Sequence, residues 1–113
     1  MKKQIRRTAL VLSAIFTLAI AFTSTAVAQD DAAALYKAKC ASCHAADGSG
    51  DTPVGKKMGV KALNSPEVAK NSDAAWTEAT KKGKGKMPAY ESKLTDDQIK
   101  ELVKYMRGLA KGK

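Results

Sequence analysis

The sequence predicts an all-α domain with long loops, and three observations lead to this fold class. No stretch of the chain alternates apolar and polar residues with the period of two that is typical of a strand. Several segments begin with residues that favour helix N-termini, and the last of them continues as an apolar stripe with helical spacing. Glycines are concentrated at residues 48–59 and 83–85, which predicts a loop in each place.

Two helices are expected in the first part of this domain. The first begins near Asp30 or Asp31, because an acidic side chain is favourable at a helix N-terminus, and it runs into the cysteine region. The second is short and opens at Ser65 and Pro66, which are suited to the N-cap and the first helical position.

Two further helices are expected towards the C-terminus. Ser72 or Asp73 caps the third helix, and Gly83 ends it. Thr95 and Gln98 form a capping box that opens the fourth helix. The apolar face of this last helix consists of Ile99, Leu102, Val103, Met106, Leu109 and Ala110. The sequence therefore predicts three to four helices.

Residues 1–28 are predicted to be a secretory signal peptide and not part of the domain. A basic start is followed by an uncharged apolar stretch and then by Ala26-Val27-Ala28, small residues at the positions that a signal peptidase reads. Cleavage after Ala28 leaves a single domain, residues 29–113. An uncleaved membrane anchor is the alternative, which the short and Ala-, Thr- and Ser-rich segment disfavours. We therefore expect an exported domain without stable membrane insertion.

The net charge of the exported domain is moderately positive. The whole chain carries +9, but four of its twenty Lys and Arg residues lie in the leader. All eleven acidic residues lie in the domain, so sixteen basic and eleven acidic side chains leave a charge of +5. This balance favours partners with acidic surfaces. Nucleic acid is disfavoured, because the domain is exported, poor in aromatic residues and has its lysines spread out.

A domain of this length has a thin core and usually needs a disulfide, a metal or a cofactor to hold it. The chain has two cysteines, Cys40 and Cys43, which are three residues apart. A disulfide between them would close a loop too short to constrain the unfolded chain. Another group is therefore expected to fill the core.

The segment Cys40-Ala41-Ser42-Cys43-His44 has the C-x-x-C-H spacing of c-type haem attachment. On a helical turn the two thiols project to one side, where each can form a thioether with a haem vinyl group. His44, the one histidine of the chain, can then bind the iron. A thiol oxidoreductase would need βαβ structure, and a zinc site would need a fourth ligand. The motif therefore predicts one covalently bound haem c.

Met87 is the predicted second ligand of the iron. It lies in the segment GKGKMPAY, residues 83–90, whose glycines let the backbone pass close to the haem and whose Pro88 stiffens the turn. Met106 is expected in the core. Met58 is expected to pack its flexible side chain against the haem edge. A ligand sensor or a peroxidase would need an open sixth position, which Met87 disfavours.

These features resemble the class I cytochromes c, particularly their short bacterial and photosynthetic members. The resemblance covers nearly all of residues 29–113. It rests on Tyr36 before the cysteines, the Cys40 to His44 motif, residues 83–90 and the Leu102 to Tyr105 segment. It implies the small cytochrome c fold, in which three to four helices surround one covalent haem. It also implies a soluble single-electron carrier of the periplasm, or of a similar exported compartment such as a thylakoid lumen, and not an enzyme.

The resemblance further implies that the first and last helices cross. Ala32 and Tyr36 would pack against Leu102 and Tyr105 at this crossing. Ala32 stands where the family commonly has glycine. The two helices can therefore still approach each other closely, but less closely than with glycine.

Two residues near the predicted haem receive roles through the resemblance. Pro53 would offer its carbonyl to the second imidazole nitrogen of His44 and so orient the ring. Trp76 has two interpretations: it fills the pocket while its indole N–H finds an acceptor in the protein, or that N–H meets a haem propionate.

Lysines are expected to border the exposed haem edge through which the family docks. Such runs often form only a solvated face, but complementary charge there would speed encounter with acidic redox partners. The docking candidates are Lys39, Lys56, Lys57, Lys82, Lys84 and Lys86, with Lys37 and Lys81 beside them. A monomer is expected. A free shuttle and a subunit of a larger complex both fit, as do respiratory and photosynthetic partners.

Overall fold

The computed structural model describes residues 26–112 of the protein. The helices in this range are α2 (Ala26–Lys39), α3 (Ala41–His44), α4 (Pro53–Met58), α5 (Pro66–Ala69), α6 (Asp73–Lys82) and α7 (Asp96–Lys111). Between them, the described residues hold no strand and a single isolated bridge, from Lys84 to Met87. The all-α prediction is therefore confirmed. The predicted signal peptide, residues 1–28, lies outside the described residues except for its last three.

The first helix begins earlier than predicted. It starts at Ala26, four residues before Asp30, because the intervening alanines and glutamine have good helix propensity. Within residues 26–112, no helix combines the length and the apolar character needed to cross a membrane.

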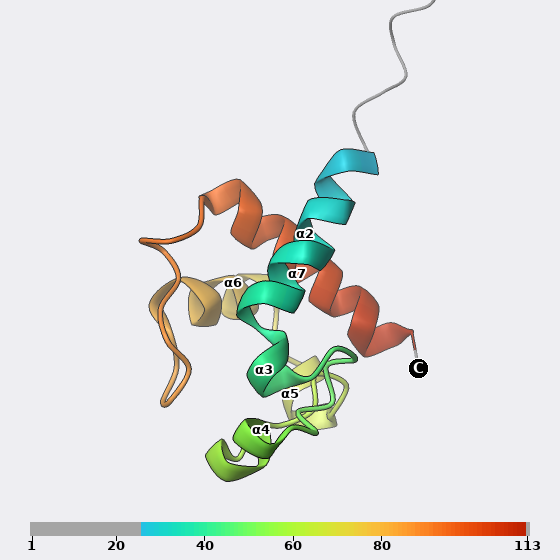
Figure 1. Ribbon diagram of the computed structural model, residues 1–113, viewed down its shortest axis with the longest axis vertical. Helices are drawn as coiled ribbons and strands as arrows, with labels where there is room; N and C mark the ends of the chain where they lie inside the picture. The colour runs from blue at the N-terminus through green and yellow to red at the C-terminus, as the bar shows by residue number, and fades with distance from the viewer. Residues whose placement is uncertain (1–25, 113) are drawn as a thin grey trace, which may run out of the picture.

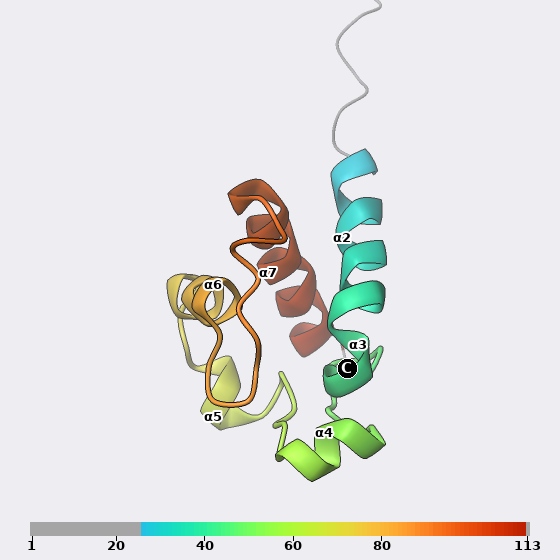
Figure 2. The same cartoon turned by 60° about the vertical axis from the view of Figure 1, so that its left-hand side comes forward.

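Helices α2 and α7 cross as the resemblance implied (Figures 1 and 2). Tyr36 on α2 is 1% exposed, and its ring lies 5.4 Å from the ring of Tyr105 on α7, centroid to centroid. Ala32 and Leu102 are also buried at 2% and 0%. A small side chain at position 32 thus suffices for the helices to pack closely.

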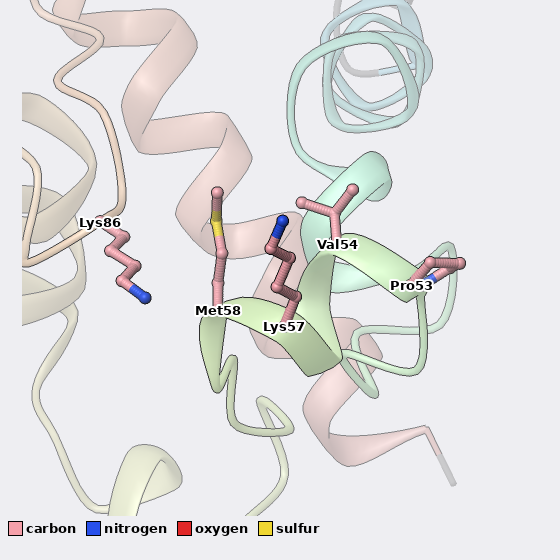
Figure 3. Close-up of a pocket in the computed structure, with 5 residues that line it drawn as sticks. All are labelled: Pro53, Val54, Lys57, Met58 and Lys86. Carbon is pink, nitrogen blue, oxygen red and sulfur yellow. The ribbon is translucent and has the colours of Figure 1, made fainter.

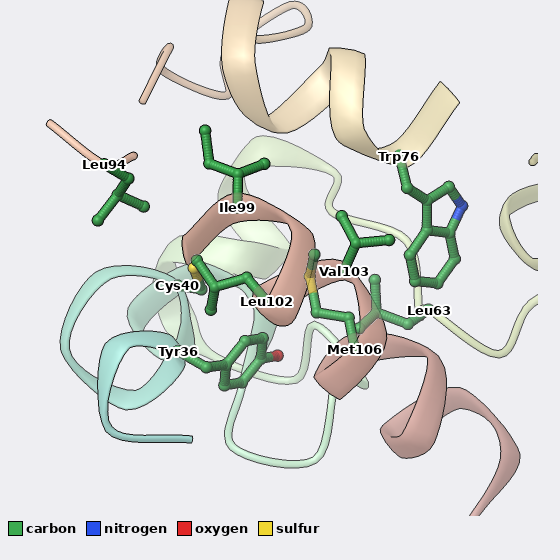
Figure 4. Close-up of a cluster of buried hydrophobic side chains, with 9 residues drawn as sticks. All are labelled: Tyr36, Cys40, Leu63, Trp76, Leu94, Ile99, Leu102, Val103 and Met106. Atoms are coloured by element: carbon green, nitrogen blue, oxygen red, sulfur yellow. The ribbon is translucent and has the colours of Figure 1, made fainter. Parts of the chain in front are cut away.

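Helix α7 supplies most of the core, as its apolar stripe predicts. The capping box is present, because Thr95 N–H donates to Gln98 Oε1 over 2.9 Å and Gln98 N–H donates to Thr95 Oγ1 over 3.2 Å. The core cluster in Figure 4 consists of Tyr36, Cys40, Leu63, Trp76, Leu94, Ile99, Leu102, Val103 and Met106. Burial of this stripe, more than helix propensity, holds α7 in place.

Helices α5 and α6 also begin where the sequence predicts. Ser65 precedes Pro66 at the start of α5, although its hydroxyl makes no capping hydrogen bond. Ser72 caps α6 by accepting from the N–H of Ala75 over 3.1 Å. Gly83 ends α6 with φ of 78°, a conformation that favours glycine.

Helix α4 is a correction to the prediction, because residues 48–59 were expected to form a loop throughout. Thr52 caps this helix by accepting from the N–H of Gly55 over 2.8 Å, Pro53 takes the first helical position, and Gly59 ends it with φ of 68°. This threonine–proline start and glycine stop are typical helix signals. With α3 they raise the helix count above the three to four expected.

Candidate functional site

The Cys40 to His44 segment folds as one tight turn at the end of α2. The N–H of Cys40 donates to the carbonyl of Tyr36 over 2.8 Å, and the N–H of His44 donates to the carbonyl of Cys40 over 2.9 Å. Both cysteines are free thiols, Cys40 buried and Cys43 half-buried. Burial, and then the charge of Cys43, raises the pKa of Cys40 to about 11, so Cys40 is a neutral thiol at neutral pH.

Tyr36 fixes the chain just after this turn. Its hydroxyl donates to the carbonyl of Ala45 over 2.8 Å, and burial raises its pKa well above the usual value, so it stays a donor. Ala45 is the one non-glycine residue with positive φ in the described chain, at 63°. Tyr36 itself lies in the core between α2 and α7 and is not a wall of the cavity described below.

The His44 imidazole has the properties of a metal ligand. Burial lowers its pKa, so the ring is neutral and keeps a lone pair for a metal. Its Nδ1 is buried and has no hydrogen-bond partner among the described residues. The expected bond to Pro53 is therefore not formed. Pro53 is the first residue of α4, where a helical carbonyl is directed along its own helix.

His44 and Met87 line the same cavity, which has a volume of about 420 Å³. Trp76 and Thr80 of α6 and Met106 of α7 form other parts of its wall. This volume lies in the range of small-molecule sites. An imidazole and a thioether facing one cavity, next to two thiols on one turn, are the donor set of a c-type haem. The residues present therefore fit that group.

Met87 is held on a short hairpin. Its N–H donates to the carbonyl of Lys84 over 3.0 Å, and the N–H of Lys84 donates to the carbonyl of Met87 over 3.2 Å. Just beyond it, the N–H of Tyr90 donates to the carbonyl of Thr80 over 3.1 Å, and the Tyr90 hydroxyl donates to that of Lys39 over 3.0 Å. The segment that carries the thioether is thus tied to both α6 and the end of α2.

Gly83 is expected to be essential for the position of Met87. An alanine Cβ at Gly83 would lie 2.5 Å from the carbonyl oxygen of Met87, whereas nothing lies within 4 Å at Gly85. Both residues have positive φ, which costs an alanine about 1–2 kcal/mol. Gly83→Ala should therefore lower the free energy of unfolding, measured by thermal unfolding, by about 2–5 kcal/mol. It should also weaken the absorption band that a methionine bound to haem iron gives. Gly85→Ala is the control and should show only the cost of positive φ, about 1–2 kcal/mol, without the steric overlap. Equal effects of the two substitutions would contradict this account.

The structure shows a protein acceptor for the indole N–H of Trp76, which favours the first of its two interpretations. Trp76 is 7% exposed, lines the cavity and donates its indole N–H to the carbonyl of Val68 over 3.2 Å. The protein itself thus provides the acceptor. Thr80, which sequence reasoning missed, is 3% exposed and donates its hydroxyl to the carbonyl of Trp76 over 2.9 Å. The sequence signal for this contact was the helical spacing of four residues between Trp76 and Thr80.

Met58 does not line the cavity that His44 and Met87 share. It lies on α4, is 42% exposed, and lines a second hollow with Pro53, Val54, Lys57 and Lys86 (Figure 3). Its expected packing against the haem edge stays a prediction. The second hollow combines exposed apolar side chains with two lysines.

The candidate docking lysines, residues 39, 56, 57, 82, 84 and 86, are all exposed. Two of them form ion pairs, Lys56 with Asp51 at 2.6 Å and Lys82 with Glu91 at 2.8 Å. Such exposed pairs contribute little to stability. Lys57 and Lys86 stand at the second hollow, from α4 and from the Met87 hairpin.

No group of three or more His, Cys, Asp or Glu side chains within residues 26–112 is arranged to hold a metal ion.

Comparisons with known proteins match this chain to c-type cytochromes. A family model described as "Cytochrome C oxidase, cbb3-type, subunit III" matches residues 27–106. Cytochrome c6 of Nostoc sp. is 33% identical over 103 residues, covering 89% of this chain and 90% of that protein. Cytochrome c-555 of Chlorobaculum tepidum is 37% identical over 108 residues, covering 89% and 96%. The solved structure of the KustC0563 c-type cytochrome aligns with a TM-score of 0.65 at 34% identity, covering 72% and 99%.

The helical fold and these relatives define a class of haem proteins that transfer electrons and are not enzymes. Haem c is the cofactor that this class implies. The chain belongs to the cytochrome c family, as a small class I member with one haem.

Proposed function

We propose that this protein is a soluble periplasmic carrier of single electrons. One haem c is attached through Cys40 and Cys43, and its iron is bound by His44 and Met87. One observation supports this most strongly. His44, which directly follows the second cysteine, and Met87, which lies far along the chain, line the same cavity. A carrier needs both axial positions filled by the protein, and these are the side chains able to fill them.

The haem, when bound, supplies a reversible one-electron couple. The chain's own residues determine how that couple is used. With the haem bound, the neutral imidazole of His44 and the thioether of Met87 would hold the iron and leave no open position for oxygen or peroxide. The cavity wall that includes Trp76 and Met106 is mainly apolar, so it would limit the access of water to a bound haem, and little should rearrange when an electron arrives. These properties favour transfer between proteins over a reaction with a bound substrate.

The purified exported protein tests this function. Its intact mass should equal residues 29–113 plus one haem, because cleavage follows Ala28 and both thiols are used. The reduced spectrum should be that of a six-coordinate haem and should resist carbon monoxide. Rapid carbon monoxide binding would indicate a sensor or a peroxidase instead. Titratable thiols and no colour would indicate a thiol oxidoreductase.

The second hollow is proposed as part of the face that meets acidic redox partners. Exposed Val54 and Met58 offer apolar contact, and Lys57 and Lys86 provide positive charge beside them. Charge complementarity of this kind raises association rates and is weakened by salt.

Reversing these two charges should change the rates of electron transfer in opposite directions for anionic and cationic reagents. At low ionic strength the Lys57→Glu, Lys86→Glu protein should reduce ferricyanide about tenfold more slowly than the wild type. It should reduce a cationic cobalt complex faster, and both differences should shrink in high salt. Lys104→Glu, an exposed charge on α7 outside the hollow, is the control. Equal effects of the control and the double variant would argue against this face.

A subunit of a larger redox complex is the second candidate function. The description of the matching family model, which names an oxidase subunit, favours it. Gel filtration of the periplasmic fraction separates the two: a free carrier elutes as a monomer, and a subunit elutes with its complex.

A further inference from the structure

Arg107 makes an unusual set of contacts on the side of α7 that meets α5 and α6. Its Nε donates to Asp73 Oδ1 over 2.7 Å, one terminal nitrogen donates to the carbonyl of Ala69 over 3.0 Å, and the other donates to the carbonyl of Asn71. Its side chain is only 18% exposed. All three guanidinium nitrogens are therefore used to hold the connection between α5 and α6.

The guanidinium also lies over the ring of Trp76, with 3.8 Å between its central carbon and the ring centroid. The indole N–H of the same tryptophan donates to Val68 at 3.2 Å. The aromatic side chain is thus held in two ways, by a cation against its ring and by an acceptor for its N–H. Trp76 in turn lines the cavity shared by His44 and Met87.

We propose that Arg107 is a positioning residue for the cofactor: it fixes Trp76 against the cavity and thereby keeps water out and the redox potential high. This inference rests on the proposed function, since it assigns the cavity to the haem. Arg107 acts through Trp76 and the α5–α6 connection and not by contact with the group itself. Solvent exposure and local charge are among the means by which a protein tunes a haem potential.

The planar shape of arginine is essential to this role. A lysine at position 107 keeps the positive charge but cannot stack as a flat group on the indole while donating to three oxygens. If charge alone mattered, Arg107→Lys would keep the wild-type potential. If positioning matters, Arg107→Lys should lower the potential, because Trp76 loosens and water gains access to the cavity.

Asp73→Asn provides a second variant whose sign separates the two explanations. Removing a negative charge should by itself raise the potential, since it favours the reduced state. Loss of the contact between Asp73 and Arg107 should instead loosen Arg107 and lower the redox potential. The carboxylate is exposed, so its replacement leaves the core intact if Arg107→Lys fails to fold.

The experiment compares these variants as holoproteins by redox titration and by hydrogen exchange of the indole N–H, which is a single signal because the chain has one tryptophan. Both variants should exchange the Trp76 indole proton at least about tenfold faster than the wild type. The ratio of reduced to oxidised protein at a fixed ambient potential should fall severalfold. Lys104→Gln, which removes one exposed charge from the same helix, is the matched control and should change neither quantity.

A wild-type potential in Arg107→Lys would overturn the inference, with or without faster indole exchange, because Arg107 would then be only structural. A raised potential in Asp73→Asn would overturn it as well. A wild type without a reversible one-electron couple would contradict the proposed function instead. The exchange comparison would then still decide whether Arg107 holds Trp76.

Discussion

Met87→Ala should leave the haem attached while opening the sixth position of its iron. The proposed thioethers to Cys40 and Cys43 and the His44 imidazole would remain, but the methionine sulfur would be lost. Because a thioether opposite an imidazole raises the potential of a haem, the midpoint should fall by on the order of 0.2 V. Carbon monoxide, which the wild type should resist, should then bind readily. Redox titration and carbon monoxide difference spectra measure both effects.

Met58→Ala is the matched control for this prediction. Met58 has the same side chain but is 42% exposed on α4 and faces the second hollow. Its removal should leave the spectrum and the potential unchanged. A wild-type spectrum in Met87→Ala, or a changed one in Met58→Ala, would contradict the assignment of the ligand.

His44→Ala should prevent formation of a stable holoprotein. The imidazole is the proposed ligand adjacent to the thiols, and the chain has no other histidine to replace it. Haem staining of the exported fraction on a denaturing gel should fall at least about tenfold, since changes even in groups that support a metal ligand cost 10–100-fold.

Ser42→Ala tests whether that loss is specific. Ser42 lies inside the same motif, is exposed and contacts Cys43 only weakly, at 3.9 Å. It should keep the wild-type staining. Undiminished staining in His44→Ala, or an equal loss in both variants, would be inconsistent with a ligand role for His44.

The helices whose signals are local could be predicted from the sequence. Thr95 and Gln98 indicate the start of α7. Its apolar stripe indicates which face packs in the core, even when the elements it packs against are not known. Ser72 and Gly83 bound α6 in the same way. Helix α4 had equally local signals in Thr52 and Pro53. The glycines around them outweighed those signals in the prediction, although Gly55 lies inside this helix, where a Cβ would overlap the carbonyl of Cys43.

Contacts between distant segments could not be predicted in the same way. Arg107 meets Ala69, Asn71 and Asp73, which precede it by 34–38 positions, and nothing near it in the chain points to them. The acceptor of the Trp76 N–H was left open because it depends on how α5 meets α6. The expected bond between Pro53 and His44 depends on tertiary geometry in the same way, and its presence in the haem-bound protein stays a prediction.

The most direct test of the central claim is to identify the methionine that binds the iron. The proposed exported domain, residues 29–113, holds Met58, Met87 and Met106. Labelling their methyl groups with ¹³C gives three NMR signals in the reduced holoprotein. A methyl bound over the haem lies in the ring current and moves far upfield of the others. We predict one such signal, absent from Met87→Ala and present in Met58→Ala. An upfield signal that belongs to Met58 or Met106, or none at all, would contradict ligation by His44 and Met87.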